Sequence, residues 1–83
     1  MFLHVGNNKN IRKKNIIGIF DMDNATVSGV TRKFLSDAQK KNIIESVSYE
    51  IPKSFVIYKE KGEVKVCFSP LSSASLYGRF LSD

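Results

Sequence analysis

The sequence is poor in residues that form covalent or metal cross-links. Its 83 residues include one cysteine, Cys67, and one histidine, His4. A single cysteine excludes a disulfide within the chain, and these two residues are too few for the four ligands of a structural zinc site. We therefore expect no metal and no other cofactor. Both residues lie among apolar neighbours, so we interpret His4 as structural and Cys67 as a small packing side chain.

Long apolar segments are also missing. The longest run, Ile16–Phe20, is far shorter than a membrane span, and Met1–Val5 is too short for the core of a signal peptide. The sequence also lacks internal repeats, low-complexity tracts and linkers, which predicts one domain over residues 1–83. We expect a cytoplasmic protein without membrane contact, because a lone cysteine suits a reducing compartment.

A chain of this length has a small core. It buries only about 60% of the surface that its unfolded form exposes. Small domains commonly gain stability from disulfides, metals or partner subunits. Because the first two are not expected here, we expect the chain to associate with further copies of itself.

Acidic residues are fewer than basic ones. Thirteen Lys and Arg stand against eight Asp and Glu, which gives a net charge of +5. This excess suits an anionic partner such as nucleic acid, although a soluble basic domain without such a partner has the same composition. Three cations in a row, Arg12, Lys13 and Lys14, come just before the longest apolar run. They are either a set of phosphate contacts or the solvated end of a hairpin.

The pattern of apolar residues predicts several strands joined by turns. Ile16–Asp21 is apolar at odd and even positions, which predicts a central strand buried on both sides. Gly6–Asn8 reads as a turn, and Lys59–Glu63 reads as a hairpin loop. The other predicted strands are Phe2–Val5, a segment near Asn10, Ile44–Tyr49, Ser54–Tyr58 and Val64–Phe68.

Two segments have helical patterns. Val27–Asn42 has an apolar stripe at Val27, Val30, Phe34 and Ala38, with Thr26 or Ser28 able to cap its start. Ser69 followed by Pro70 predicts the start of a short helix over Leu71–Leu81. The expected fold is an α/β protein of the α+β type. It has a small, mostly antiparallel sheet, one main helix and a short C-terminal helix.

Two carboxylates, Asp21 and Asp23, follow the predicted central strand. An EF-hand calcium loop starting at Asp21 would need glycine and glutamate where Thr26 and Arg32 stand, so that site is excluded. The segment also resembles the opening motif of haloacid-dehalogenase-type phosphatases, in which Asp21 would be the nucleophile and Asp23 the acid/base with magnesium. That family has Thr or Val at the position of Ala25 and needs a larger domain with a later lysine and acidic pair. We expect no enzyme, and we interpret the carboxylates as a cap before a helix.

Four stretches together resemble the RemB branch of the RemA/RemB family of bacterial extracellular-matrix regulators, over nearly the whole chain. The resemblance implies a LytTR-like fold in a cytoplasmic protein. It also implies ring-like homo-oligomers that bind double-stranded DNA and regulate transcription of biofilm-matrix genes. The stretches are Leu3–Gly6, Asn15–Asp21, Pro52–Ile57 and Phe68–Ser73.

The resemblance also indicates where DNA would bind. RemA-type chains have arginines just before the central strand, where this chain has three cations. They have an arginine pair in the loop before the next-to-last strand, where this chain has Glu50, Ile51 and Pro52, followed by Lys53. A glutamate and two apolar residues do not replace bidentate guanidinium contacts. The expected nucleic-acid-binding residues are Arg12, Lys13, Lys14 and Lys53, with Lys33 and Lys40 as further candidates.

Two functional hypotheses follow. The first is an oligomeric, non-enzymatic transcriptional regulator whose partners are copies of itself and double-stranded DNA. The alternative is an oligomeric protein-interaction scaffold that binds no nucleic acid.

Overall fold

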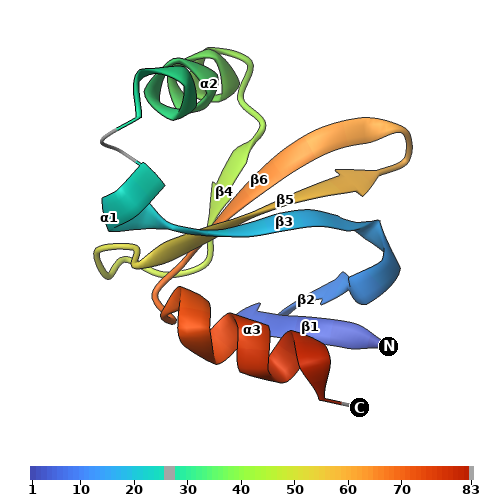
Figure 1. Cartoon of the computed structure of the whole chain (residues 1–83). Coiled ribbons are helices and arrows are strands. Elements are labelled where there is room, and N and C mark those ends of the chain that lie inside the picture. Colours follow the sequence, from blue (N-terminus) through green and yellow to red (C-terminus); the bar gives the residue numbers. More distant parts are fainter. Residues whose placement is uncertain (26–27, 83) are drawn as a thin grey trace.

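A four-stranded sheet forms the middle layer of the protein, with the strand order β3-β5-β6-β4 (Figure 1). Strand β5 pairs antiparallel with β3 and with β6, and β4 pairs parallel with β6. The computed structural model describes residues 1–25 and 28–82. The strands of this sheet are β3 (Ile16–Asp21), β4 (Ile44–Ser46), β5 (Ser54–Glu60) and β6 (Glu63–Ser69).

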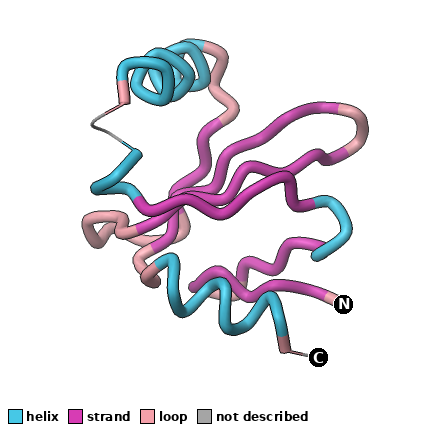
Figure 2. Tube along the Cα trace, viewed as in Figure 1, coloured by secondary structure: helices cyan, strands magenta, loops and turns pink. Residues whose placement is uncertain are grey.

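Different elements cover the two faces of the sheet (Figures 1 and 2). A lower layer contains the antiparallel hairpin of β1 (Phe2–Gly6) and β2 (Lys9–Arg12), together with helix α3 (Ser73–Leu81). An upper layer contains helix α2 (Gly29–Lys40). Two short elements flank β3: the 3₁₀ turn η1 (Lys13–Asn15) precedes it, and the single-turn helix α1 (Met22–Ala25) follows it. The predicted α+β class is confirmed.

The core lies mainly around β5 and β6. Side chains alternate between the faces of a strand, so Phe55 and Val66 face the upper layer while Val56 and Cys67 face the lower one. All four are fully or almost fully buried. The upper cluster of buried residues is Ala38, Phe55 and Val66. The lower cluster is Leu3, Val5, Ile11, Ile19, Val56, Tyr58, Cys67 and Leu76.

The predicted central strand is instead an edge strand. Strand β3 has β5 on one side only, and Ile17 is 60% exposed. The prediction was wrong because an apolar run does not reveal how many strands flank it, and here only β5 does. The ladder also shifts register between Ile16 and Gly18, a bulge that takes Ile17 out of the regular pairing. The ring of Phe20 folds back over Gly18 and stacks on Phe55, with the two ring centroids 5.1 Å apart. A side chain at Gly18 would collide with that ring, which explains the one glycine in the run.

The main helix is shorter than predicted. Helix α2 begins at Gly29, and the Ser28 hydroxyl oxygen accepts the Thr31 N–H at 3.4 Å, so Ser28 is its cap. The helix ends at Lys40, and Asn42 follows with a left-handed φ of 59°. The other proposed cap, Thr26, and the first residue of the predicted stripe, Val27, lie outside the described residues. Val30 is 82% exposed, so it does not belong to the apolar stripe.

Two other predicted boundaries were wrong. Helix α3 is capped by Ser72, whose hydroxyl accepts the Ser75 N–H at 3.1 Å, and not by Ser69. Ser69 instead donates to the Val5 carbonyl at 2.7 Å, which joins β6 to β1 across the core. Strand β4 ends at Ser46 and not at Tyr49: the Val47 N–H still donates to the Phe68 carbonyl of β6 at 3.3 Å, but the residues up to Tyr49 are not in strand conformation.

The predicted turn chemistry is confirmed at two hairpins. Asn7 and Asn8 both have positive φ between β1 and β2, and Lys61 and Gly62 do so between β5 and β6. Asn and Gly adopt this conformation at low cost, which sets the tight turns. None of the described helices combines the length and apolar composition needed to cross a membrane.

Candidate nucleic-acid interface

The three consecutive cations lie where the chain passes from the lower layer into the sheet. Arg12 is the last residue of β2, and Lys13 and Lys14 form the 3₁₀ turn η1 that leads into β3. The Lys13 N–H donates to the Met1 carbonyl at 3.0 Å, which holds the turn against the start of β1. Paired strands therefore fix both ends of this short basic segment.

Aromatic rings support two of the three cations. The guanidinium carbon of Arg12 lies 5.5 Å from the centroid of the Phe2 ring, and the Lys13 ammonium lies 5.9 Å from that of Phe80. Lys13 also donates to the Ser82 carbonyl just after α3. These contacts restrict both side chains while leaving the charges on the surface. Lys14 is exposed and has no side-chain partner in the described part of the chain.

The cations converge on two adjacent hollows. Arg12, Lys13 and Lys14 line a hollow of about 320 Å³ together with Met1. Arg12 also lines a second hollow of about 290 Å³. Lys61, in the turn between β5 and β6, lines this second hollow too. We call Arg12, Lys13, Lys14 and Lys61 the basic corner.

Lys61 was missed because it was interpreted only as part of a hairpin loop. The signal that could have placed it is the antiparallel pairing of β3 with β5, in which Ile16 opposes Tyr58. That register brings the end of β5, and the turn after it, beside the start of β3. A residue far away in the sequence thereby extends the surface of the three consecutive cations.

One carboxylate residue, Glu60, lines the second hollow beside Arg12 and Lys61, but it pairs with Lys65, and no ion pair within residues 1–25 and 28–82 includes a cation of the basic corner. The ion pairs of the described residues lie elsewhere: Lys9 with Glu45 at 3.1 Å, Lys33 with Asp37 at 3.4 Å, and Lys65 with Glu60 at 3.8 Å. Cations that have no carboxylate partner and line a common hollow attract anionic groups such as phosphates.

The other predicted contacts lie away from the basic corner. Lys53 precedes β5 at the opposite end of the β3–β5 ladder, roughly 17 Å away at the usual rise per strand residue. Its backbone is fixed there, since its N–H donates to the Ser69 carbonyl at 2.9 Å and its carbonyl accepts the Met22 N–H at 3.0 Å. Lys33 and Lys40 belong to α2 in the upper layer. Within one chain, the structure does not bring these lysines together with the basic corner.

The Asp21 carboxylate at the end of β3 accepts hydrogen bonds from the backbone. One oxygen of Asp21 accepts the Asp23 N–H at 2.8 Å and the Asn24 N–H at 3.4 Å, which caps α1 as interpreted from the sequence. Among the described residues, no three His, Cys, Asp or Glu side chains gather as a metal site would require.

A small polar network joins the lower hairpin to the sheet. Burial lowers the pKa of Lys9, but the hydrogen bond and charge of Glu45, together with Tyr58, raise it above its usual value. Burial also raises the pKa of Tyr58. Burial, together with the nearby charge of Glu45, raises the pKa of the Cys67 thiol to about 12. A reactive thiol needs a shift in the opposite direction, so the interpretation of Cys67 as a packing residue is confirmed by its burial.

Comparison with known proteins identifies one curated relative. No family model matches the chain. The relative, named extracellular matrix regulatory protein B, comes from Bacillus subtilis (strain 168) and is 34% identical over 79 residues. The match covers 95% of this chain and 89% of the relative, so the similarity extends over the whole fold and includes the segment of the basic corner.

Proposed function

The chain belongs to the RemB family of extracellular matrix regulatory proteins, and from that premise we propose that it is an oligomeric, DNA-associated transcriptional regulator without catalytic activity. The observation that carries this proposal is the basic corner. Its four cations line two adjacent hollows, and no carboxylate in the described part of the chain pairs with them.

The cations of the basic corner suit the DNA backbone. Arg12 offers a planar fork that can hold a phosphate through two hydrogen bonds, and Lys14 adds a mobile point charge. Lys13 uses one of its three N–H donors on the Ser82 carbonyl and keeps two for a phosphate. Such contacts set the position of a protein on DNA without reading its sequence, and they make binding steeply dependent on salt.

Assembly would compensate for the small number of contacts in each chain. Copies that present the same cations along one duplex gain avidity without any new contact. The outer edge of β3 pairs with no strand of the described chain, although its Ile19 carbonyl accepts the Tyr77 hydroxyl at 3.2 Å, and its exposed Ile17 offers one surface through which chains can associate. Contact with chromosomal DNA requires the compartment that holds it, so we propose a cytoplasmic location.

The test compares two triple variants with the same loss of charge. One changes the basic corner (Arg12→Gln, Lys13→Gln, Lys14→Gln), and the control changes two lysines of α2 and the residue that follows it (Lys33→Gln, Lys40→Gln, Lys41→Gln). Duplex affinity is measured by fluorescence anisotropy over a range of salt concentrations, with light scattering as a check on assembly. The slope of log affinity against log salt should fall by about 0.9 for each lost phosphate contact in the first variant and change little in the control.

Three results would contradict this proposal. Absence of duplex binding by the intact protein at low salt would remove its basis. Equal losses in the two variants would show that net charge, and not the basic corner, governs the affinity. A monomeric mass in solution would exclude the avidity argument even where DNA is bound.

A second function is favoured by the loop between β4 and β5. Tyr49 is fully exposed in this loop, and Ile51 is 87% exposed. Ile51 lies where the family resemblance implies an arginine pair, and exposed apolar and aromatic groups such as Ile51 and Tyr49 suit contact with a protein. We propose as the alternative a scaffold that assembles through such contacts. The double variant Tyr49→Ser, Ile51→Ser should then lower the mass in solution, whereas the regulator model expects unchanged assembly.

A further inference from the structure

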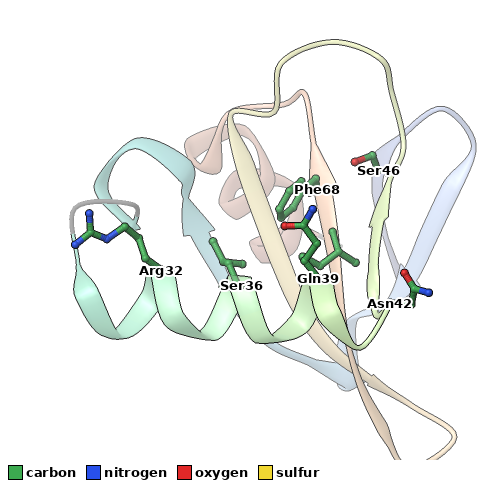
Figure 3. A pocket seen from close by; sticks show the side chains of 8 residues that line it. Arg32, Ser36, Gln39, Asn42, Ser46 and Phe68 are labelled. Atoms are coloured by element: carbon green, nitrogen blue, oxygen red, sulfur yellow. The ribbon is translucent and has the colours of Figure 1, made fainter.

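A groove opens between α2 and the upper face of the sheet, on the side away from the basic corner (Figure 3). Its volume is about 500 Å³, within the range of small-molecule sites. Half-buried apolar side chains of Leu35, Ile44 and Phe68 form its floor. The exposed polar rim consists of Arg32, Ser36, Gln39, Asn42 and Ser46.

The polar groups divide along the groove into two kinds. Figure 3 shows Arg32 toward one end of α2, Gln39 beside Phe68, and Asn42 farther along, just beyond the other end of the helix. Arg32 and Gln39 are seven residues apart on one helix, which corresponds to about 10 Å along its axis. One end therefore offers a cation, and the other offers an aromatic ring with two groups that can each donate and accept hydrogen bonds.

Among residues 1–25 and 28–82, no acidic side chain lines the groove. Asp37 is on α2 but pairs with Lys33, and Glu45 is on β4 but pairs with Lys9. Arg32 has no ion pair or side-chain hydrogen bond within the described residues. The groove thus combines an unneutralised guanidinium with an apolar floor, which suits an anion that carries a flat apolar body.

From this arrangement we propose that the groove binds a purine nucleoside di- or triphosphate. The base covers the floor over Phe68, where stacking on an aromatic ring is favourable for any base. The amides of Gln39 and Asn42 hydrogen-bond to the base edge, in the way that such amides hold adenine. The phosphates extend along α2 to Arg32, whose guanidinium fork matches their geometry.

A ligand in this position would strengthen the upper layer. Helix α2 contacts the sheet through a small set of side chains, namely Phe34, Leu35 and Ala38. A nucleotide held by α2 on one side and by β4 and β6 on the other adds contacts between them. Because it binds the folded chain only, it raises the melting temperature, and above the dissociation constant this rise grows with the logarithm of the ligand concentration.

The experiment titrates ADP, GDP, UDP and inorganic tripolyphosphate into the full chain and follows backbone amides by NMR. Purine nucleotides should shift the amides of Ser36, Gln39, Ile44 and Phe68, and tripolyphosphate alone should leave them in place. Tripolyphosphate is the necessary control, because it would bind the basic corner as well as any nucleotide does.

Matched variants test the two ends of the groove. Arg32→Gln should weaken ADP binding by about tenfold or more, since a charge-assisted hydrogen bond is lost. Lys33→Gln removes the same charge from the neighbouring position of α2, where the side chain pairs with Asp37, and should change the affinity less than about twofold. Gln39→Leu should reduce the preference for ADP over tripolyphosphate while leaving the melting temperature of the unliganded chain nearly unchanged.

Two outcomes would overturn the inference. One is the absence of any amide shift at millimolar nucleotide. The other is a set of shifts confined to Lys13, Lys14 and Lys61 that tripolyphosphate reproduces, which would mean that the phosphates bind the basic corner. Neither outcome bears on DNA binding, which is measured separately with the duplex.

Discussion

The two faces of the central sheet are covered in different ways. Below the sheet, the β1–β2 hairpin and α3 close a cluster of eight buried residues, in which Leu3, Val5 and Leu76 are wholly inaccessible. Above it, α2 contributes one buried apolar residue, Ala38, and two half-buried apolar ones, Phe34 and Leu35. The lower layer is a sealed core, and the upper layer leaves a groove beside its helix.

The two candidate binding surfaces lie on different layers. The basic corner arises where the lower layer joins the sheet, so its cations rest on the part of the molecule with the most buried contacts. Phosphate contacts benefit from such rigid support, because less side-chain and backbone entropy is lost on binding. The groove adjoins the layer with fewer contacts, which can adjust to a ligand.

At neutral pH, shortening one leucine in each layer gives the largest expected contrast. Leu76→Ala removes a fully buried side chain below the sheet and should lower the free energy of unfolding by about 3 kcal/mol, because a cavity remains. Leu35→Ala removes a half-buried side chain above the sheet and should cost roughly 1 kcal/mol. Urea unfolding followed by circular dichroism measures both. Equal losses would show that the upper layer is as tightly packed as the lower one.

Removing the Ser69 hydroxyl tests the hydrogen bond that joins the lower layer to the sheet. This buried hydroxyl donates to the Val5 carbonyl at 2.7 Å and accepts the Leu71 N–H at 3.1 Å. Ser69→Ala leaves both buried partners unsatisfied, which should cost about 2 kcal/mol in urea unfolding. Ser36→Ala makes the same chemical change on the exposed face of α2 and should stay within about 0.5 kcal/mol of the parent. If Ser69→Ala lowers the free energy of unfolding by less than about 0.5 kcal/mol, its role as a link between β1 and β6 is contradicted.

Local patterns in the sequence predicted most of the fold. The hairpin turn at Asn7 and Asn8, the alternation along β5 and β6, and the Asp21 cap each depend on a few neighbouring residues, and all three are confirmed. The position of β3 within the sheet could not be predicted from its neighbouring residues. An apolar run looks alike in a central strand and in an edge strand with a bulge, and only its pairing partners decide between them.

The candidate site could be predicted in part for the same reason. Arg12, Lys13 and Lys14 are consecutive, so their clustering follows from the sequence itself. Lys61 joins them through the register of β5 against β3, and Lys53 is kept away by that same register. The groove beside α2 combines residues from three elements that no local pattern connects.

The buried thiol gives a pH test of the sealed layer. The pKa of Cys67 is raised from its usual 9.0 to about 12, so above pH 9 the unfolded chain loses a proton that the folded chain keeps. The free energy of unfolding should therefore fall between pH 9 and 12, by up to about 1.4 kcal/mol per pH unit from this group.

The matched variants for this pH test first remove the buried thiol and then add an exposed one. Cys67→Ala should flatten the alkaline decline, leaving only the share of groups such as Tyr58. Adding Ser36→Cys to that variant places a thiol on the exposed face of α2 and should not restore the decline. An alkaline slope that is the same with and without Cys67 would contradict the inference that this thiol is held protonated by burial.

The smallest expected contrast is between the two helix caps. The Ser72 hydroxyl accepts the Ser75 N–H at 3.1 Å at the start of α3, and the Ser28 hydroxyl accepts the Thr31 N–H at 3.4 Å at the start of α2. Ser72→Ala should lower the free energy of global unfolding by about 1 kcal/mol, because α3 carries Leu76 into the sealed core. Ser28→Ala should lower the free energy of global unfolding by less than about 0.5 kcal/mol and should instead speed amide hydrogen exchange within α2, because this helix can open without exposing the lower cluster.

Ser75→Ala is the control in α3, since it keeps the cap and places a better helix former at an exposed site. Equal global losses from both caps would mean that the two layers unfold as one unit, and the contrast between a sealed and an adjustable face would then have to be given up.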